Sequence, residues 1–101
     1  MNSIKEKARH LIQKQDYDSA LALLIPRFTR EKDAEIVYMI GKCFYEKLDI
    51  SNAVRFFQRA LEYDPMNREF LFAMGRAYQA FDQPAEALNI YRRIVKEKCL
   101  K

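Results

Sequence analysis

Few side chains in this sequence of 101 residues could carry catalysis or hold a metal ion. His10 is the only histidine, and no serine or cysteine is placed to form a nucleophilic pair with it. The two cysteines, Cys43 and Cys99, lack the C-x-x-C spacing of a zinc site. Gly41 and Gly75 are the only glycines, which leaves no glycine-rich loop for a phosphate. The sequence therefore predicts a binding protein rather than an enzyme, with no cofactor and no metal.

The distribution of charge argues against nucleic acid as the ligand. The formal net charge is +4, but acidic and basic residues alternate along the chain, for example at 30–33 and 96–98. Such interleaving is typical of solvent-exposed helix faces and leaves no continuous basic stripe. Nucleic-acid binding is therefore kept only as a third alternative.

The sequence shows neither a membrane span nor a secretory signal. It contains no run of about 18 apolar residues, and its first residues lack the charged and then apolar layout of a signal peptide. We therefore expect a cytoplasmic protein. In that reducing compartment Cys43 is expected to be a buried thiol, and His10 an exposed polar residue.

The two glycines occupy the same place in two copies of one pattern. In each copy a large apolar residue precedes the glycine, an aromatic residue follows three positions later, and an alanine and a second aromatic residue come further on. A glycine within a helix costs about 1 kcal/mol relative to alanine, so we expect a second helix to approach closely there, with the first aromatic residue filling the gap one turn on. The alanine and the second aromatic residue would be the reciprocal small and large residues of the second helix. The residues are Val37, Ile40, Gly41, Phe44, Ala53 and Phe57, and, 34 residues later, Leu71, Met74, Gly75, Tyr78, Ala87 and Tyr91.

This period, with Pro65 after the first copy, resembles the tetratricopeptide repeat (TPR) family over the whole chain. The resemblance implies an all-α fold in which three antiparallel helix-turn-helix repeats form a short right-handed superhelical solenoid. The repeats would span 1–33, 34–67 and 68–101 as a single domain. The first repeat is degenerate, because Ala8 replaces the glycine, Leu11 the first aromatic residue and Lys7 an apolar residue. Ala20 and Leu24 hold the places of the later alanine and of the second aromatic residue.

Capping residues predict where six helices begin and end. Ser3 and Glu6 form a capping-box pattern, and aspartates stand at further N-cap places. Proline at the start of the last helix is tolerated in a first turn. We expect helices from Ser3 to about Gln15, from Tyr17 onward, and at 34–47, 50–63, 67 or 68–80 and 84–98.

Pro26 falls inside the second predicted helix. It removes the backbone bond to Ala22 and costs about 3 kcal/mol or more in a helix interior. Two outcomes are open: a kink or early stop near Ile25, or a helix broken into 17–25 and a separate turn at 26–30.

The first helix is polar on the face where later first helices are apolar. A polar face without a neighbour is what a terminal repeat requires, so we expect Met1 to be the natural start. The residues at these places are Ser3, Lys7 and His10 in the first repeat, Ile36, Ile40 and Cys43 in the second, and Phe70, Met74 and Ala77 in the third.

The last helix carries the opposite feature. Leu88 and Val95 stand at the places of Val54 and Leu61, which the third repeat would cover. We expect the front part of a longer protein, or else a second chain over this face; a tolerated apolar edge is the remaining possibility.

The resemblance also implies a binding site, because the first helices of TPR arrays line a concave groove that holds an extended or helical peptide. Arg9, Lys42 and Arg76 share one place in the three repeats and would form a ladder with steps of about 8–10 Å. Such a groove suits an acidic peptide with apolar anchors, unless Glu35 and Glu69 neutralise the ladder. The expected groove residues are Lys5, Arg9, Ile12, Tyr38, Lys42, Tyr45, Phe72, Arg76 and Gln79.

Other functions of such repeats remain as alternatives. The two-carboxylate clamp for the acidic tail of heat-shock chaperones is not expected, since its places hold Lys5, Arg9, Met39, Glu69 and Ala73, of which only Lys5 fits. Assembly as a homodimer through Leu88, Tyr91 and Val95 is the runner-up. A protein resembling bacterial secretion chaperones, which cradle an amphipathic segment of a partner, is a further possibility.

Overall fold

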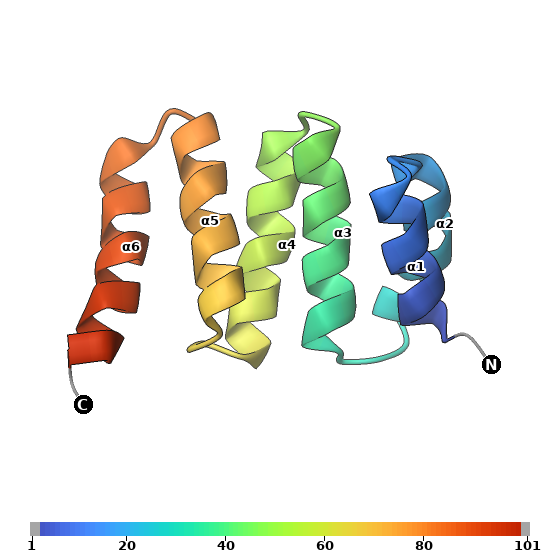
Figure 1. Ribbon diagram of the computed structural model, residues 1–101, viewed down its shortest axis with the longest axis horizontal. Coiled ribbons are helices and arrows are strands. Elements are labelled where there is room, and N and C mark those ends of the chain that lie inside the picture. The colour runs from blue at the N-terminus through green and yellow to red at the C-terminus, as the bar shows by residue number, and fades with distance from the viewer. Residues whose placement is uncertain (1–2, 100–101) are drawn as a thin grey trace.

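The computed structural model describes the backbone of residues 3–99 and the side chains of residues 3–95. Within these residues the secondary structure consists of six helices and no strand, which confirms the predicted all-α fold. Three antiparallel helix pairs follow one another along the longest axis of the molecule (Figure 1). The helices are α1 (Ile4–Gln13), α2 (Tyr17–Phe28), α3 (Ala34–Glu46), α4 (Ile50–Tyr63), α5 (Arg68–Ala80) and α6 (Pro84–Cys99).

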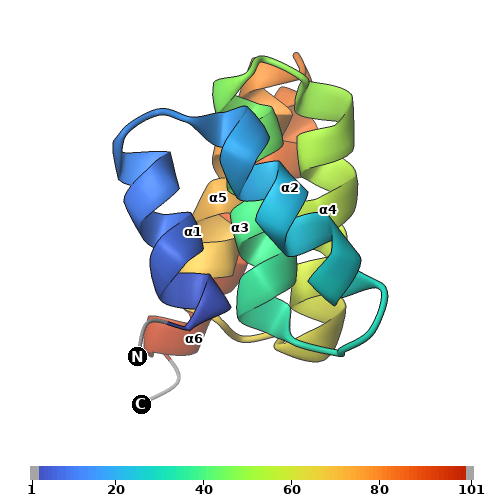
Figure 2. The same ribbon diagram turned by 90° about the vertical axis from the view of Figure 1, so that its right-hand side faces the viewer.

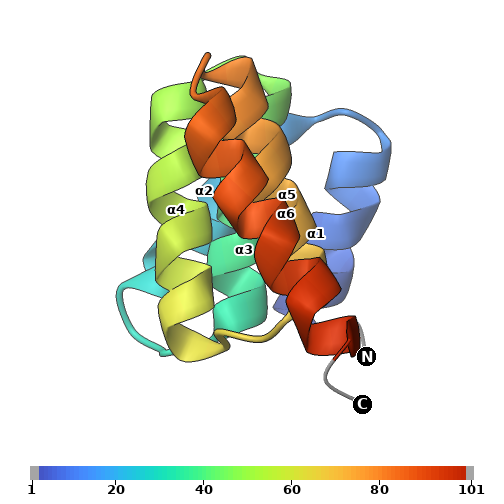
Figure 3. The ribbon, with the colours of Figure 1, turned by 90° about the vertical axis from the view of Figure 1, so that its left-hand side faces the viewer.

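The first helices of successive pairs lie side by side. Each helix packs on its neighbours in the chain, and α1 also contacts α3, as α3 contacts α5. Viewed along the long axis, α1 and α4 lie on opposite sides of the stack with the other helices between them (Figures 2 and 3). The helices α1, α3 and α5 therefore form one continuous surface.

Side-chain caps fix where the helices begin. Ser3 Oγ accepts a hydrogen bond from the Glu6 backbone N–H at 3.1 Å, and Glu6 Oε1 accepts one from the Ser3 N–H at 3.1 Å, which is the expected capping box. At the starts of α2 to α5 the N-cap side chain accepts a hydrogen bond from a backbone N–H of the first turn; these side chains are Asp16, Asp33, Asp49 and Asn67.

The turn inside every pair has the same geometry. Gln15, Leu48 and Asp82 adopt positive φ angles of 64°, 67° and 59° directly after the C-caps of α1, α3 and α5. The next N–H in each case bonds back to a carbonyl of the last helical turn at 2.8 Å, as in a Schellman motif. The prediction that α1 continues to about Gln15 is wrong, because the left-handed conformation of Gln15 ends the helix at Gln13.

Pro26 does not end its helix. The α2 helix continues to Phe28, so the expected early stop near Ile25 and the expected break into 17–25 and a separate turn are both wrong, while the expected kink stays a prediction. The proline lies in the last turn, where only its own bond to Ala22 is lost. Thr29 closes the end of the helix, because its N–H donates to the Ile25 carbonyl at 3.4 Å and its hydroxyl donates to the Pro26 carbonyl at 2.8 Å.

The core has two clusters that meet at three phenylalanines. Phe28 packs edge-on against Phe56 with ring centroids 5.3 Å apart, and Phe44 stacks on Phe56 at 5.6 Å. All three rings contact both clusters. One cluster is formed by α1, α2 and α3, and the other by α3, α4, α5 and α6. This aromatic group therefore joins the first helix pair to the second.

The glycines mark close helix crossings, and Phe57 and Tyr91 lie opposite them as predicted, whereas the expectation that Phe44 fills the gap at Gly41 is wrong. A Cβ atom on Gly41 would lie 2.6 Å from the Phe57 ring, and one on Gly75 would lie 2.5 Å from the Tyr91 ring. The aromatic ring of the second helix thus covers each glycine, whereas Phe44 stacks on Phe56.

The polar face of α1 and the apolar faces of α3 and α5 agree with the sequence. Ser3, Lys7 and His10 are exposed. Their counterparts on α3 and α5 are buried, including Cys43, which is 0 % exposed. Burial raises the pKa of the Cys43 thiol to about 11, so it is protonated at neutral pH.

We expect Gly41→Ala to lower the free energy of unfolding by about 1–3 kcal/mol, because the added methyl group would collide with the enclosed Phe57 ring. Phe57→Leu alone leaves a cavity and should also cost about 1–3 kcal/mol. The double variant reproduces Ala8 and Leu24 of the first pair and should cost less than the sum. Urea unfolding of all four proteins measures this coupling, and strictly additive effects would contradict it.

Candidate functional site

Two hollows lie on the surface formed by α1, α3 and α5, which we call the groove. The larger, of about 490 Å³, extends from Arg9 and Ile12 across α3 to Glu69 and Phe70. The smaller, of about 60 Å³, lies between α3 and α5. Tyr38 and Lys42 line both hollows, so the groove is continuous across α3.

Tyr38 holds α5 against α3 at the centre of the groove. Its ring lies 4.8 Å from that of Phe70 and 5.8 Å from that of Phe57, between centroids. It is 8 % exposed, and its hydroxyl donates to Glu69 Oε2 at 3.3 Å. Burial and the nearby Glu69 carboxylate raise the pKa of Tyr38, so it donates this hydrogen bond throughout the neutral range.

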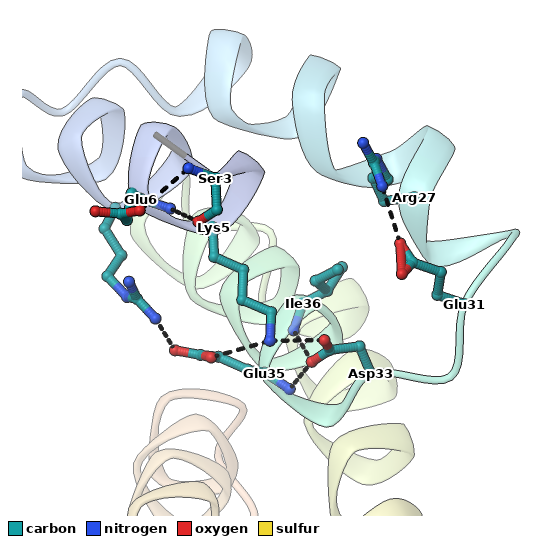
Figure 4. A network of polar contacts seen from close by, with 9 residues as sticks. Ser3, Lys5, Glu6, Arg27, Glu31, Asp33, Glu35 and Ile36 are labelled. Atoms are coloured by element: carbon teal, nitrogen blue, oxygen red, sulfur yellow. Dashed lines mark hydrogen bonds and ion pairs between the residues drawn. The ribbon is translucent and has the colours of Figure 1, made fainter. Parts of the chain in front are cut away.

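The two predicted cations of α1, Lys5 and Arg9, form ion pairs with carboxylates of the same chain. Lys5 Nζ lies 2.7 Å from Asp33 Oδ2 and 3.4 Å from Glu35 Oε1, and the Arg9 guanidinium donates to Glu35 as well. Asp33 also caps α3 by accepting from the N–H groups of Glu35 and Ile36 at 3.0 and 3.3 Å. Figure 4 shows how Lys5, Asp33 and Glu35 converge at the start of α3.

The protonation equilibria of these carboxylates reflect the network. Burial alone would raise the pKa of Asp33, but hydrogen bonds from Lys5 and from the Ile36 and Glu35 N–H groups outweigh it and lower that pKa. The hydrogen bond from Arg9 is the main reason why the pKa of Glu35 is lowered. Both groups are therefore ionised at neutral pH and bind the first pair to the second.

Among the described side chains, Lys42 and Arg76 lie over tyrosine rings instead of pairing with carboxylates. Lys42 Nζ lies 5.6 Å from the centroid of the Tyr38 ring, and the Arg76 guanidinium lies 5.8 Å from that of Tyr45. Within residues 3–95, neither cation forms an ion pair with a carboxylate. The expected ladder of three cations is thus reduced to two, and its first member, Arg9, is the one that is neutralised.

The groove is charged differently at its two ends. Asp33, Glu35, Asp64 and Glu69 line the larger hollow near the starts of α3 and α5. Arg76 follows Glu69 by seven residues in α5, which corresponds to about 10 Å along the helix. An acidic ligand therefore fits the half of the groove around Lys42 and Arg76, whereas the other half repels it.

Of the remaining predicted groove residues, one lines a hollow and two lie outside both hollows. Ile12 is half-buried and lines the larger hollow. Phe72 is 47 % exposed, with its ring 6.4 Å from that of Tyr91. Gln79 Oε1 accepts a hydrogen bond from the Tyr91 hydroxyl at 2.9 Å. Phe72 and Gln79 thus lie toward α6, at the far edge of the groove, and line neither hollow.

Two functional features were not predicted from the sequence. Asp33 was recognised only as a helix cap, although it also pairs with Lys5. Ala73 lines the smaller hollow, and its counterpart on α3, 34 residues earlier, is Met39. The change from methionine to alanine between these two corresponding positions is the feature of the sequence from which a space in the groove wall could have been predicted.

The outer face of α6 is apolar and exposed. Leu88 and Val95 are 49 % and 59 % exposed, whereas Val54 and Leu61, at the same places on α4, are each 8 % exposed. Tyr91 is half-buried, since its ring covers Gly75. The expected association face therefore consists mainly of Leu88 and Val95.

The described part of the chain presents neither a metal site nor a membrane-spanning helix. In that part, no three His, Cys, Asp or Glu side chains are grouped so that they could hold a metal ion. Across residues 3–99, no helix is both long and apolar enough to cross a membrane.

The chain is similar to known proteins in both sequence and fold. A family profile described as Tetratricopeptide repeat matches residues 44–98. Tetratricopeptide repeat protein 8 of mouse (Mus musculus) and of human (Homo sapiens) are each 33% identical over 73 residues, covering 72% of this chain but only 14% and 13% of those proteins. The solved structures of MamA AMB-1 and MamA MSR-1 have TM-scores of 0.82 and 0.81 at 20% sequence identity. Those superpositions cover 92% and 93% of this chain and 55% and 56% of the MamA chains.

Substitutions at Asp33 should separate its two roles. Asp33→Ala loses the helix cap and the ion pair with Lys5, so we expect a loss of about 1–2 kcal/mol in the free energy of unfolding. Asp33→Asn keeps an N-cap acceptor and should cost less than about 1 kcal/mol. Urea unfolding at neutral pH compares the two, and equal losses would contradict a separate capping role.

The same variants predict a pH dependence. Because the folded-state pKa values of Asp33 and Glu35 lie below their ordinary values of 3.8 and 4.5, their stabilisation is present above those values and is lost as the pH falls through the folded ones. Between about pH 5 and pH 2, the wild type should therefore lose stability more steeply than Asp33→Asn. Parallel curves for the two proteins would contradict the lowered pKa of Asp33.

Proposed function

Because the chain belongs to the tetratricopeptide repeat family, we propose that it is a protein-interaction module that holds a peptide segment of a partner in the groove of α1, α3 and α5. Its three helix pairs would be the repeats 1–33, 34–67 and 68–101. The observation that carries the proposal is the pair of cations Lys42 and Arg76, each held over a tyrosine ring and, within residues 3–95, without a carboxylate partner.

Cations held in this way are suited to bind an acidic ligand. Contact with the face of a ring leaves N–H groups of Lys42 and Arg76 free for another acceptor. Since the rings already restrict both side chains, less conformational entropy is lost when a carboxylate binds. Asp64 and Glu69 disfavour an acidic segment at the starts of the helices, which directs it to the α3–α5 half of the groove.

Apolar surface lies along the groove on both sides of these cations. Tyr45, half-buried on α3, lies under Arg76, Ile12 lines the larger hollow that Lys42 also lines, and Phe72 is exposed at the edge toward α6. Aromatic and apolar anchors provide most of the affinity in protein complexes, whereas charges mainly steer association and give specificity. The groove therefore fits a peptide, extended or helical, whose acidic residues are flanked by apolar ones.

Reversing both cations should abolish capture of such a peptide. We expect Lys42→Glu with Arg76→Glu to weaken binding of a short fluorescent peptide of alternating glutamate and leucine by about tenfold or more. The matched control is Arg55→Glu with Arg92→Glu, which changes the net charge equally at exposed sites on α4 and α6. Fluorescence anisotropy measures both. Equal weakening by the two double variants would contradict a site at Lys42 and Arg76.

Self-association through α6 is a second candidate function, favoured by a different observation. Leu88 and Val95 are exposed at places where the corresponding residues of α4 are buried against α5. A second copy of the chain that covered this face would remove the apolar area from water.

This candidate predicts a concentration-dependent mass. Light scattering of the wild type should show a dimer that dissociates on dilution, because the two exposed side chains form only a small apolar face. Leu88→Glu with Val95→Glu should remain folded and monomeric at every concentration. A wild type that is monomeric throughout would exclude self-association through α6.

A further inference from the structure

The smaller hollow, of about 60 Å³, owes its space to Ala73. Phe57 of α4, which is 1 % exposed, lies beneath it, and Tyr38 and Tyr45 of α3 line it together with Ala73 of α5. The preceding first helix carries Met39 at the place of Ala73. A methionine here would extend into the hollow, so alanine at this position leaves room for a group from outside.

The size of the hollow restricts what can enter it. About 10–15 Å³ of cavity volume is enough for one water molecule, so a hollow of about 60 Å³ has room for a group of a few heavy atoms. A carboxylate with its adjoining methylene group has this size. A methyl group also fits, but it would give the surrounding charges no partner.

The charge of the hollow indicates a singly charged anion. Lys42 and Arg76 are positive and Glu46 is negative, which leaves one net positive charge around it. A carboxylate balances this charge. A phosphate group carries about −1.5 to −2 at neutral pH and would leave an excess of negative charge beside Glu46.

We infer that this hollow receives one acidic side chain of the bound peptide, with its carboxylate between Lys42 and Arg76 and its methylene groups against Tyr38 and Tyr45. The inference rests on the proposed function and adds a specificity-determining residue, Ala73, which leaves the space that the acidic side chain fills.

Titration with short peptides, followed by the backbone amide signals of the isotope-labelled protein, tests this assignment. The probes are the acetylated tripeptide amides Leu-Glu-Leu and Leu-Gln-Leu, which have nearly the same shape but differ in charge. The amides of Lys42 and Ala73 should shift with saturation, and Leu-Glu-Leu should bind about tenfold more tightly than Leu-Gln-Leu.

Ala73→Met separates the hollow from the charges around it. It fills the space with the side chain found at the same place on α3, leaves every charge unchanged, and should abolish the preference for glutamate over glutamine. Ala80→Met, at an exposed site of the same helix, is the matched control and should keep the preference. Circular dichroism checks that both variants are folded. Arg76→Gln, which removes one of the two positive charges, should also abolish the preference and tests the placement of the carboxylate if Ala73→Met unfolds.

The outcomes distinguish this inference from the proposed function. Equal affinity for both tripeptides, or a preference that survives Ala73→Met, would overturn the inference, while saturable shifts elsewhere on α3 and α5 would still support a peptide groove. A failure of both tripeptides to shift any amide of α1, α3 or α5 would overturn both. Tighter binding of Leu-phosphoserine-Leu than of Leu-Glu-Leu would overturn the assignment to a carboxylate.

Discussion

In the second and third helix pairs, an aromatic ring of the second helix lies where the first helix has no side chain. Phe57 covers Gly41 and Tyr91 covers Gly75, at distances that exclude even a methyl group. This contact sets how closely the two helices cross and so where the first helix lies relative to its neighbours. Phe57 also contacts Tyr38 and lies beneath the smaller hollow. The packing of the pair and the shape of the candidate site therefore share one side chain.

A second contact recurs between successive pairs and decides which cations remain available. Lys5 binds Glu35, and Tyr38, at the corresponding place on α3, binds Glu69. Each bond holds the start of the next first helix. The Glu35 carboxylate binds both Lys5 and Arg9 of α1, so the charge of Arg9 is neutralised. The Glu69 carboxylate instead accepts a hydrogen bond from the uncharged Tyr38 hydroxyl of α3. Lys42 has no ion-pair partner within residues 3–95.

Features that depend on nearby residues could be predicted from the sequence, and those that depend on distances between helices could not. The spacing of Gly41 and Gly75 gave the helix pairs, and the capping aspartates gave most helix starts. The end of α1 was missed because Gln15 takes a left-handed conformation that non-glycine residues rarely adopt. The partners of Lys5 and Arg9 and the hollow at Ala73 arise only when α1, α3 and α5 come together.

The central claim is that the α3–α5 half of the groove selects acidic peptides. Selection from a random peptide library displayed on phage tests it without assuming a ligand, when wild-type protein and the Lys42→Glu, Arg76→Glu variant are used side by side. The account predicts that peptides selected by the wild type are enriched in acidic residues next to apolar ones and are not retained by the variant. Selected peptides without an acidic preference, or acidic peptides that bind both proteins equally, would contradict it.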